Sequence, residues 1–230
     1  MTDLNRTGRE SSLPRAVAAV IEGIEADVIR GVILPRGRLI EDHLMEDYGA
    51  KRHAVRAALE ELERAGIVVK PRHRGAELRR FTPEEIDALY DTRAILHRAA
   101  VQHMSPPTEE EAAALEAALS GHEAACETGD LVAIHQANMA FHDALFGLCA
   151  NPYLAAAIRH HDWLSFPIRA YGVADAGALS RARAEHRDMV ELVRASRLDE
   201  LEDLVVRHMG PARDIYTARF ISGQVPRPGG

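Results

Sequence analysis

The sequence predicts a mainly α-helical protein in two parts: a small N-terminal unit of three helices and a β-hairpin, then an all-helical bundle of six or seven helices. Apolar residues recur at helical spacing along most of the 230 residues, and alternating strand patterns are confined to residues 67–79. Residues 1–80 carry 15 Lys and Arg against 13 Asp and Glu, and the other 150 carry 13 against 22. We therefore expect domains at 1–80 and 81–222, with a Pro- and Gly-rich tail at 223–230 that is disordered.

The N-terminal helices are each expected to end at a glycine, which tolerates the positive φ of a sharp turn. They span about 14–30, 40–48 and 52–65. Ser11 or Ser12 is available as the N-cap of the first helix, and a short turn with Gly49 separates the second from the third. This is the layout of a helix-turn-helix, whose second helix lies in the major groove of DNA.

A basic hairpin follows the third helix. Strands are expected at 67–69 and 76–79, joined by a basic turn, which makes the unit a winged helix-turn-helix. Residues 51–80 hold nine Lys and Arg against four Asp and Glu, a charge pattern typical of a DNA-binding surface, although a merely solvated basic face is the alternative. The predicted DNA contacts are Lys51, Arg52, His53 and Arg56 in the helix and Arg72, His73 and Arg74 in the wing.

Residues 34–44 (LPRGRLIEDHL) and 51–59 (KRHAVRAAL) resemble the winged helix of the GntR family, and Arg74-Gly75 matches the family's wing glycine. The resemblance implies that Arg52 and Arg56 contact DNA. The family's third helix usually opens with a Ser-Arg-Thr-Pro-Val-Arg-like segment, from which Lys51, His53 and Ala54 depart.

Helix starts in the C-terminal part are expected where capping residues precede periodic apolar segments. Thr82 with Glu85, and Thr108 with Glu111, form capping boxes. Further starts are expected at Asp130, Asn151, Ser180 and Asp199. Almost no strand pattern intervenes, so this part is predicted to be an all-helical bundle.

Polar residues interrupt the apolar faces of three of these helices. Asn138 and His142 are i, i+4 neighbours, His135 could approach the same face, and His186 and His208 lie on inward faces of two later helices. Imidazole is the commonest metal-binding side chain, so a shared site for zinc, or for nickel, manganese or iron, is predicted. Any one such histidine alone would more often be a hydrogen-bonded core residue.

Residues 138–145 (NMAFHDAL), 151–154 (NPYL) and 185–187 (EHR), with His208 22 positions later, resemble the FCD ligand-binding domain of FadR-type GntR regulators. The resemblance implies that Asn138, His142, His186 and His208 bind a divalent metal.

Arg93 lies on an apolar face of the first bundle helix, and a buried arginine needs an anion. The resemblance implies that Arg93 helps to bind the carboxylate of an effector, while His97 stands where an acidic residue is usual. The alternative is that Arg93 pairs with an acid on a neighbouring helix.

These observations predict a homodimeric DNA-binding transcription regulator that binds a metal and a small carboxylate effector. Repression relieved by an organic acid follows from the resemblance. A metal-dependent hydrolase with a three-histidine site is one alternative; its candidate bases would be Asp143 and Glu185, although Glu185 is expected to point elsewhere. A regulator that binds its ligand without a metal is another.

A cytoplasmic location is expected. No apolar run approaches the roughly 20 residues of a membrane helix, and the N-terminus is polar. Cys126 and Cys149 are too few for a disulfide framework, so reduced thiols are expected.

Overall fold

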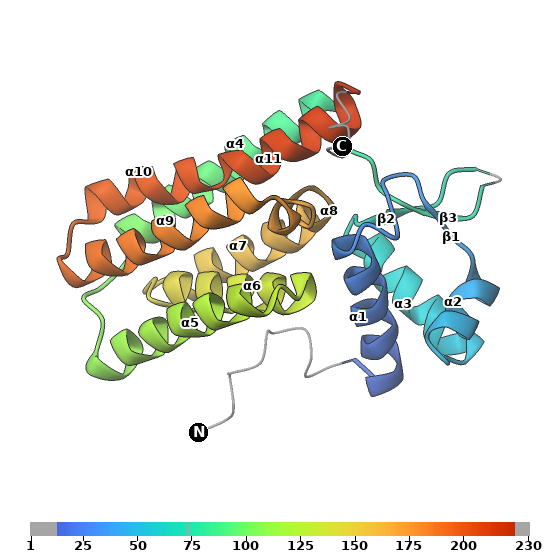
Figure 1. Cartoon of the computed structure of the whole chain (residues 1–230), viewed down its shortest axis with the longest axis horizontal. Coiled ribbons are helices and arrows are strands. Elements are labelled where there is room, and N and C mark those ends of the chain that lie inside the picture. Colours follow the sequence, from blue (N-terminus) through green and yellow to red (C-terminus); the bar gives the residue numbers. More distant parts are fainter. Residues whose placement is uncertain (1–12, 73, 224–230) are drawn as a thin grey trace. The chain divides into compact units, whose positions relative to one another are not determined.

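The computed structural model describes residues 13–72 and 74–223, and most of these residues are helical (Figure 1). They form two compact units, with the division between Arg80 and Phe81. None of the described helices is both long and apolar enough to cross a membrane. The predicted mainly α-helical fold class is confirmed.

The first unit contains three helices and a three-stranded antiparallel sheet. The helices are α1 (Arg15–Ile29), α2 (Glu41–Asp47) and α3 (Arg52–Arg64), and the strands are β1 (Arg38–Leu39), β2 (Val68–Val69) and β3 (Ala76–Leu78). Helix α3 packs on α1 and α2, and the strand order is β1-β3-β2. The sequence pattern missed β1, because two residues are too few to show alternation.

Glycines set the two turns that define this unit. Gly49 has φ 59° between α2 and α3, and Gly66 has φ 74° between α3 and β2. Both values lie in the left-handed region, where a side chain would be strained. The proposed serine caps at Ser11 and Ser12 lie outside the described residues, and the resolved N-cap of α1 is Pro14.

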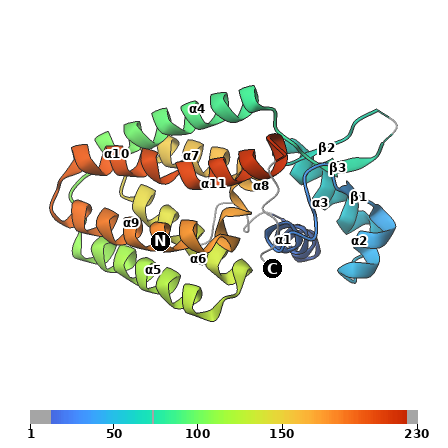
Figure 2. The same ribbon diagram turned by 45° about the horizontal axis from the view of Figure 1, so that its top comes forward.

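The second unit is a helical bundle. Its helices are α4 (Pro83–Gln102), α5 (Glu109–Thr128), α6 (Leu131–Gly147), α7 (Pro152–Leu164), α8 (Phe166–Arg169), α9 (Ala176–Arg194), α10 (Leu198–His208) and α11 (Gly210–Tyr216), with short segments η1 (Gly172–Ala174) and η2 (Thr217–Ile221). The six longest form a closed ring in the order α4, α7, α6, α5, α9, α10, in which each packs on the next and α10 returns to α4 (Figure 2).

The capping residues place most of these helices correctly. Thr82 and Thr108 each form a complete capping box, and the side chains of Asp130 and Asn151 accept hydrogen bonds from the first turns of α6 and α7. The predicted starts at Ser180 and Asp199 are wrong. Helix α9 begins at Ala176, because the side chain of Asp175 accepts from the backbone of Ala178 and caps the helix one turn earlier. Helix α10 begins at Leu198, one residue before Asp199.

Candidate functional site

Each helix of the ring directs a polar side chain inward. These residues are Arg93 (α4), His122 (α5), His142 (α6), Asp162 (α7), His186 (α9) and His208 (α10), and all but His186 line one cavity. The cavity has a volume of about 90 Å³. The ring of six helices thus surrounds a small cavity that is lined by histidines from α4, α5, α6 and α10.

Three of the predicted ligands meet. Ring nitrogens of His142, His186 and His208 lie within 4.8 Å of one another, and the Nε2 atoms of His186 and His208 are 3.2 Å apart. Asn138 also lines the cavity. Burial lowers the pKa values of His142 and His186 well below the ordinary value, so both rings are neutral and keep a lone pair for a ligand.

A fourth histidine completes this cluster and was missed in the sequence. His122 is buried, with its Nδ1 atom 3.2 Å from Nδ1 of His186. It follows Leu115 and Leu119 at i+7 and i+3, so helical spacing already placed it on the inner face of α5. Burial, and secondarily the neighbouring His208, lower the pKa of His122 to about 4.

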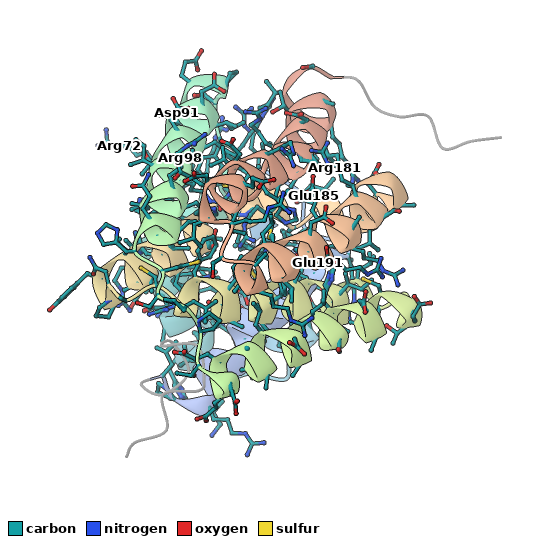
Figure 3. The ribbon with its side chains drawn as sticks, turned by 90° about the vertical axis from the view of Figure 1, so that its left-hand side faces the viewer. Arg72, Asp91, Arg98, Arg181, Glu185 and Glu191 are labelled. Carbon is teal, nitrogen blue, oxygen red and sulfur yellow. The ribbon has the colours of Figure 1, made fainter. Side chains whose placement is uncertain are left out.

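Glu185 belongs to the site, and the expectation that it points elsewhere is wrong. Its Oε2 atom lies 2.7 Å from Nδ1 of His208, and Nε of Arg181 donates to its Oε1 atom at 2.7 Å (Figure 3). Burial raises the pKa of Glu185, but the bonds from His208 and Arg181 outweigh this and hold it below the ordinary value. An ionised Glu185 fixes the proton of His208 on Nδ1, which leaves Nε2 facing the cluster.

The residues present fit a divalent metal. His142 has a buried Nδ1 atom with no hydrogen-bond partner among the described residues. A buried polar atom without a partner costs free energy unless a ligand binds to it. Three imidazoles with a carboxylate and a fourth imidazole behind them are a donor set that zinc and similar ions prefer.

The arginine end of the cavity holds a buried ion pair. NH2 of Arg93 donates to Oδ1 of Asp162 at 2.6 Å, and both side chains are about 5% exposed. An acid on a neighbouring helix therefore does pair with Arg93, as the alternative prediction held. Nε and NH1 of Arg93 nevertheless have no partner in the described part of the chain, so two of the three guanidinium nitrogens stay available.

A second arginine of the cavity, the half-buried Arg169 of α8, was also missed. Its NH2 atom donates to the backbone oxygen of Asp162 at 2.8 Å, while its Nε atom has no partner within the described ranges. Burial raises the pKa of the Asp162 carboxyl, but Arg93 and Arg169 together offset this and leave it below the ordinary value. Asp162 is thus ionised between two cations.

His97 lies in the same region, with its ring centroid 4.5 Å from that of Phe146. Neither of its ring nitrogens bonds to another described residue. Burial, and then the charge of Arg93, lower the pKa of His97 to about 3, so the ring is neutral. It offers an uncharged donor or acceptor beside the arginines.

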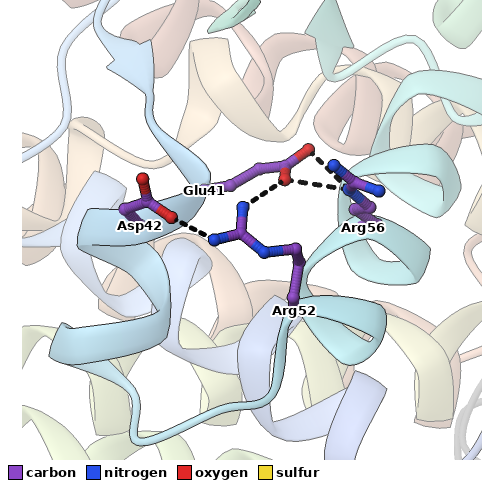
Figure 4. A network of polar contacts seen from close by, with 4 residues as sticks. All are labelled: Glu41, Asp42, Arg52 and Arg56. Carbon is purple, nitrogen blue, oxygen red and sulfur yellow. Dashed lines mark hydrogen bonds and ion pairs between the residues drawn. The ribbon is translucent and has the colours of Figure 1, made fainter.

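In the first unit, acids on α2 hold the predicted DNA-contacting arginines of α3 (Figure 4). Arg52 bonds through NH1 to Glu41 at 3.2 Å and through NH2 to Asp42 at 2.6 Å. Arg56 donates from Nε to both oxygens of Glu41, at 2.9 and 3.1 Å. All of these contacts are solvent-exposed, so they can exchange with another anion.

The other predicted DNA contacts lie at the start of α3 and in the wing. Lys51 is the exposed N-cap of α3, and His53 is exposed in its first turn. Arg72 and Arg74 lie in the turn between β2 and β3, whereas His73 falls outside the described residues. Arg38, Arg56, Lys70 and Arg74 line one groove beside the wing.

Two families match these units. Residues 16–78 match the bacterial regulatory proteins of the gntR family, and residues 88–210, more than half of the chain, match the FCD domain. An uncharacterized HTH-type transcriptional regulator from Bacillus subtilis (strain 168), YdhC, is 25% identical over 183 residues, which cover 79% of this chain and 82% of that protein.

Solved structures share the fold. A GntR transcriptional regulator from Rhodococcus sp. RHA1 has a TM-score of 0.68 at 20% identity, over 89% of this chain and 98% of its own. The E. coli protein McbR/YncC has a TM-score of 0.70 at 18% identity, over 90% and 100%.

A winged helix-turn-helix joined to a helical ligand-binding bundle defines a DNA-binding transcription regulator and not an enzyme. The chain belongs to the GntR family of bacterial regulators that carry an FCD domain.

Proposed function

We propose that this regulator, of the FadR type, binds a divalent metal and a small carboxylate in its FCD domain and that the carboxylate changes its affinity for operator DNA. The observation that carries the proposal is that one cavity is lined both by members of the histidine cluster and by Arg93, which has nitrogens without hydrogen-bond partners. An effector can act this way only if it binds two conformations of the protein with different affinity. Such a regulator works on DNA in the bacterial cytoplasm.

His142, His186 and His208 would hold the ion, with zinc favoured and nickel, manganese or iron as alternatives, and Asn138 is close enough in sequence to His142 to supply an oxygen. A bound ion would supply a Lewis-acidic position for a carboxylate oxygen. Glu185 and His122 orient His208 and His186, while Arg93 and His97 face the effector.

Metal content tests this proposal. Inductively coupled plasma mass spectrometry on untagged protein should find about one equivalent of metal per chain, which the variant His142→Ala/His186→Ala/His208→Ala should lose. Less than about a tenth of an equivalent, with no reconstitution, would refute the metal site. Thermal unfolding of the variant shows whether the loss reflects the site or the fold.

A metal-free regulator is the second candidate, and one observation favours it. Contacts at 3.2, 3.2 and 2.7 Å link His122, His186, His208 and Glu185 in one series. One set of neutral tautomers satisfies all three contacts: His122 donates to His186, His186 donates to His208, and His208 donates to Glu185. This series leaves Nδ1 of His142 without a partner, which is why we favour the metal.

We further propose that Arg52 and Arg56 contact the operator and that a homodimer presents two copies of α3 and the wing, with Lys51, His53, Arg72, His73 and Arg74 contributing. Replacing either arginine with alanine should weaken operator binding by about 1–3 kcal/mol if the lost contact is bidentate to a base. Arg64→Ala, an exposed arginine at the far end of the same helix, is the matched control. Unchanged affinity in both test variants would refute their placement.

A further inference from the structure

The arginine end of the cavity carries more positive than negative charge. The charged side chains that line the cavity are Arg93, Arg169, Asp162 and Glu185. Glu185 is engaged by Arg181 and His208, and Asp143, which also acts on Arg169, interacts most strongly with Arg159, so Asp162 is the only carboxylate among the lining residues left for the two guanidinium groups. Guanidinium groups keep their proton in proteins, so the lining of this end carries one positive charge more than it has carboxylates.

The same end also has more donors than acceptors. Nε and NH1 of Arg93 and Nε of Arg169 are buried without partners among the described residues, although Arg93 is only 4% exposed. Buried guanidinium donors are stable only when an acceptor meets them. A carboxylate is the acceptor that matches both the charge and the planar fork of arginine.

The opposite end has a different character. Asn138 carries no charge, burial keeps His142 and His186 neutral, and the proposed function already directs one carboxylate of the effector toward them. Arg93 and Arg169 form a separate group of donors in the same chamber. A ligand with a single acid group would leave one of the two ends without its anion.

The volume favours a short ligand, although the cavity is partly open to solvent. A water molecule needs at least roughly 10–15 Å³ on this scale, so about 90 Å³ accommodates on the order of six to nine non-hydrogen atoms of the ligand. Malonate and succinate, with seven and eight non-hydrogen atoms, fall within this range, and adipate, with ten, exceeds it.

We propose that the effector is a compact dicarboxylate with a backbone of three or four carbons, whose second carboxylate is bound between Arg93 and Arg169. The proposal rests on the proposed carboxylate-sensing function and adds to it a second anion subsite, with Arg169 as its new binding residue. Asp162 fixes both arginines, one through its side chain and one through its backbone oxygen.

Isothermal titration calorimetry on the full-length protein tests this with chain-matched acids: malonate against propionate, and succinate against butyrate. Each dicarboxylate should bind at least about tenfold more tightly than its partner, equivalent to about 1.4 kcal/mol. Adipate should bind more weakly than succinate. Equal affinity within a pair would overturn the second subsite and leave the carboxylate-sensing function standing, whereas no binding by any of the acids would refute both.

Variants locate the subsite. Arg169→Lys keeps a charge but loses the planar fork, and Arg169→Gln loses both, so succinate should lose about tenfold or more in affinity, with glutamine the worse. Butyrate affinity should change by less than about threefold. Arg159→Gln, an exposed arginine of α7, is the control. Thermal melts without ligand show whether the Arg169 variants are folded. If they are not, the comparison of malonate with propionate and of succinate with butyrate on the unmodified protein tests the proposal by itself.

Discussion

Two clusters of arginine and carboxylate groups in this protein have the same chemistry and opposite surroundings. On α2 and α3, Arg52 and Arg56 share Glu41 and Asp42 in solvent. Inside the bundle, the buried Arg93 bonds to the carboxylate of Asp162, and the half-buried Arg169 bonds to its backbone oxygen. Exposed pairs contribute about 0–1 kcal/mol, whereas removing one partner of a buried pair costs about 3–5 kcal/mol.

The difference shows how one kind of contact serves two tasks. The exposed acids keep the arginines of α3 in place, and in the proposed operator complex they give way readily to DNA phosphates or bases. The cluster in the bundle is largely withdrawn from solvent, so in our proposal the anion that it lacks has to enter the cavity. Replacing one anion by another therefore costs little free energy at the surface, whereas in the interior it selects for an anion that fits the cavity.

The largest expected effect comes from Asp162→Asn. Because it leaves the buried Arg93 without its carboxylate and removes the negative charge beside Arg169, the second unit should lose about 3–5 kcal/mol of unfolding free energy. Urea unfolding followed by the fluorescence of Trp163, the only tryptophan, reports on this unit. Glu41→Gln should cost the first unit less than about 1 kcal/mol by circular dichroism. Similar losses of unfolding free energy in both variants would contradict the difference between the exposed and the buried cluster.

The pH dependence of the unfolding free energy should distinguish His97 from the carboxylates, because the two kinds of group affect stability over different pH ranges. Its pKa falls from 6.5 in the unfolded chain to about 3 in the folded one, so its stabilising contribution is complete above pH 6.5 and is lost as pH falls toward 3. At pH 4.5 this amounts to about 2–3 kcal/mol. Asp162, whose pKa is lowered, contributes a loss only below its unfolded value near 3.9.

The variant His97→Gln should therefore show a shallower decline of unfolding free energy between pH 6.5 and 4.5 than the unmodified protein, measured by urea unfolding at each pH. His103→Gln, an exposed histidine at the end of the same helix, should follow the unmodified profile. Parallel profiles for all three proteins would contradict a neutral, buried His97.

Glu185 is intermediate between the two clusters, since it is buried but bonded to an exposed arginine. Glu185→Gln removes the charge that polarises His208, so metal affinity should fall about 10- to 100-fold, or about 1.4–2.7 kcal/mol. Competition with a chelator measures this. Glu191→Gln on the exposed face of the same helix is the control, and an equal effect of both variants would mean that only net charge matters (Figure 3).

The smallest effect should come from Asp42→Asn. It removes one acid from Arg52 and a negative charge from the surface proposed to face DNA, so non-specific DNA binding should tighten by less than about 1 kcal/mol. Asp47→Asn makes the same charge change at the other end of α2. A titration of both variants at two salt concentrations shows whether the contact with Arg52 adds to the change in net charge.

Local sequence patterns predicted most of the fold, because capping residues and helical periodicity act within one or two turns. The same periodicity turned His142, His186 and His208 inward, and the packing of their helices brought the rings together. Arg169 was missed because its partner is seven residues away across a helix break, where spacing carries no directional information. Glu185 was misjudged because its bond to His208 depends on how α9 and α10 cross.

The position of Arg93 along its helix has a mechanical consequence. The chain passes from one unit to the other beside Phe81, whose backbone N–H donates to the hydroxyl of Tyr216 at 3.3 Å, and α4 starts two residues later. Arg93 lies ten residues into that helix, about 15 Å along its axis. A rigid rod moves as a whole, so any displacement of α4 at Arg93 also displaces the only covalent connection to the winged helix.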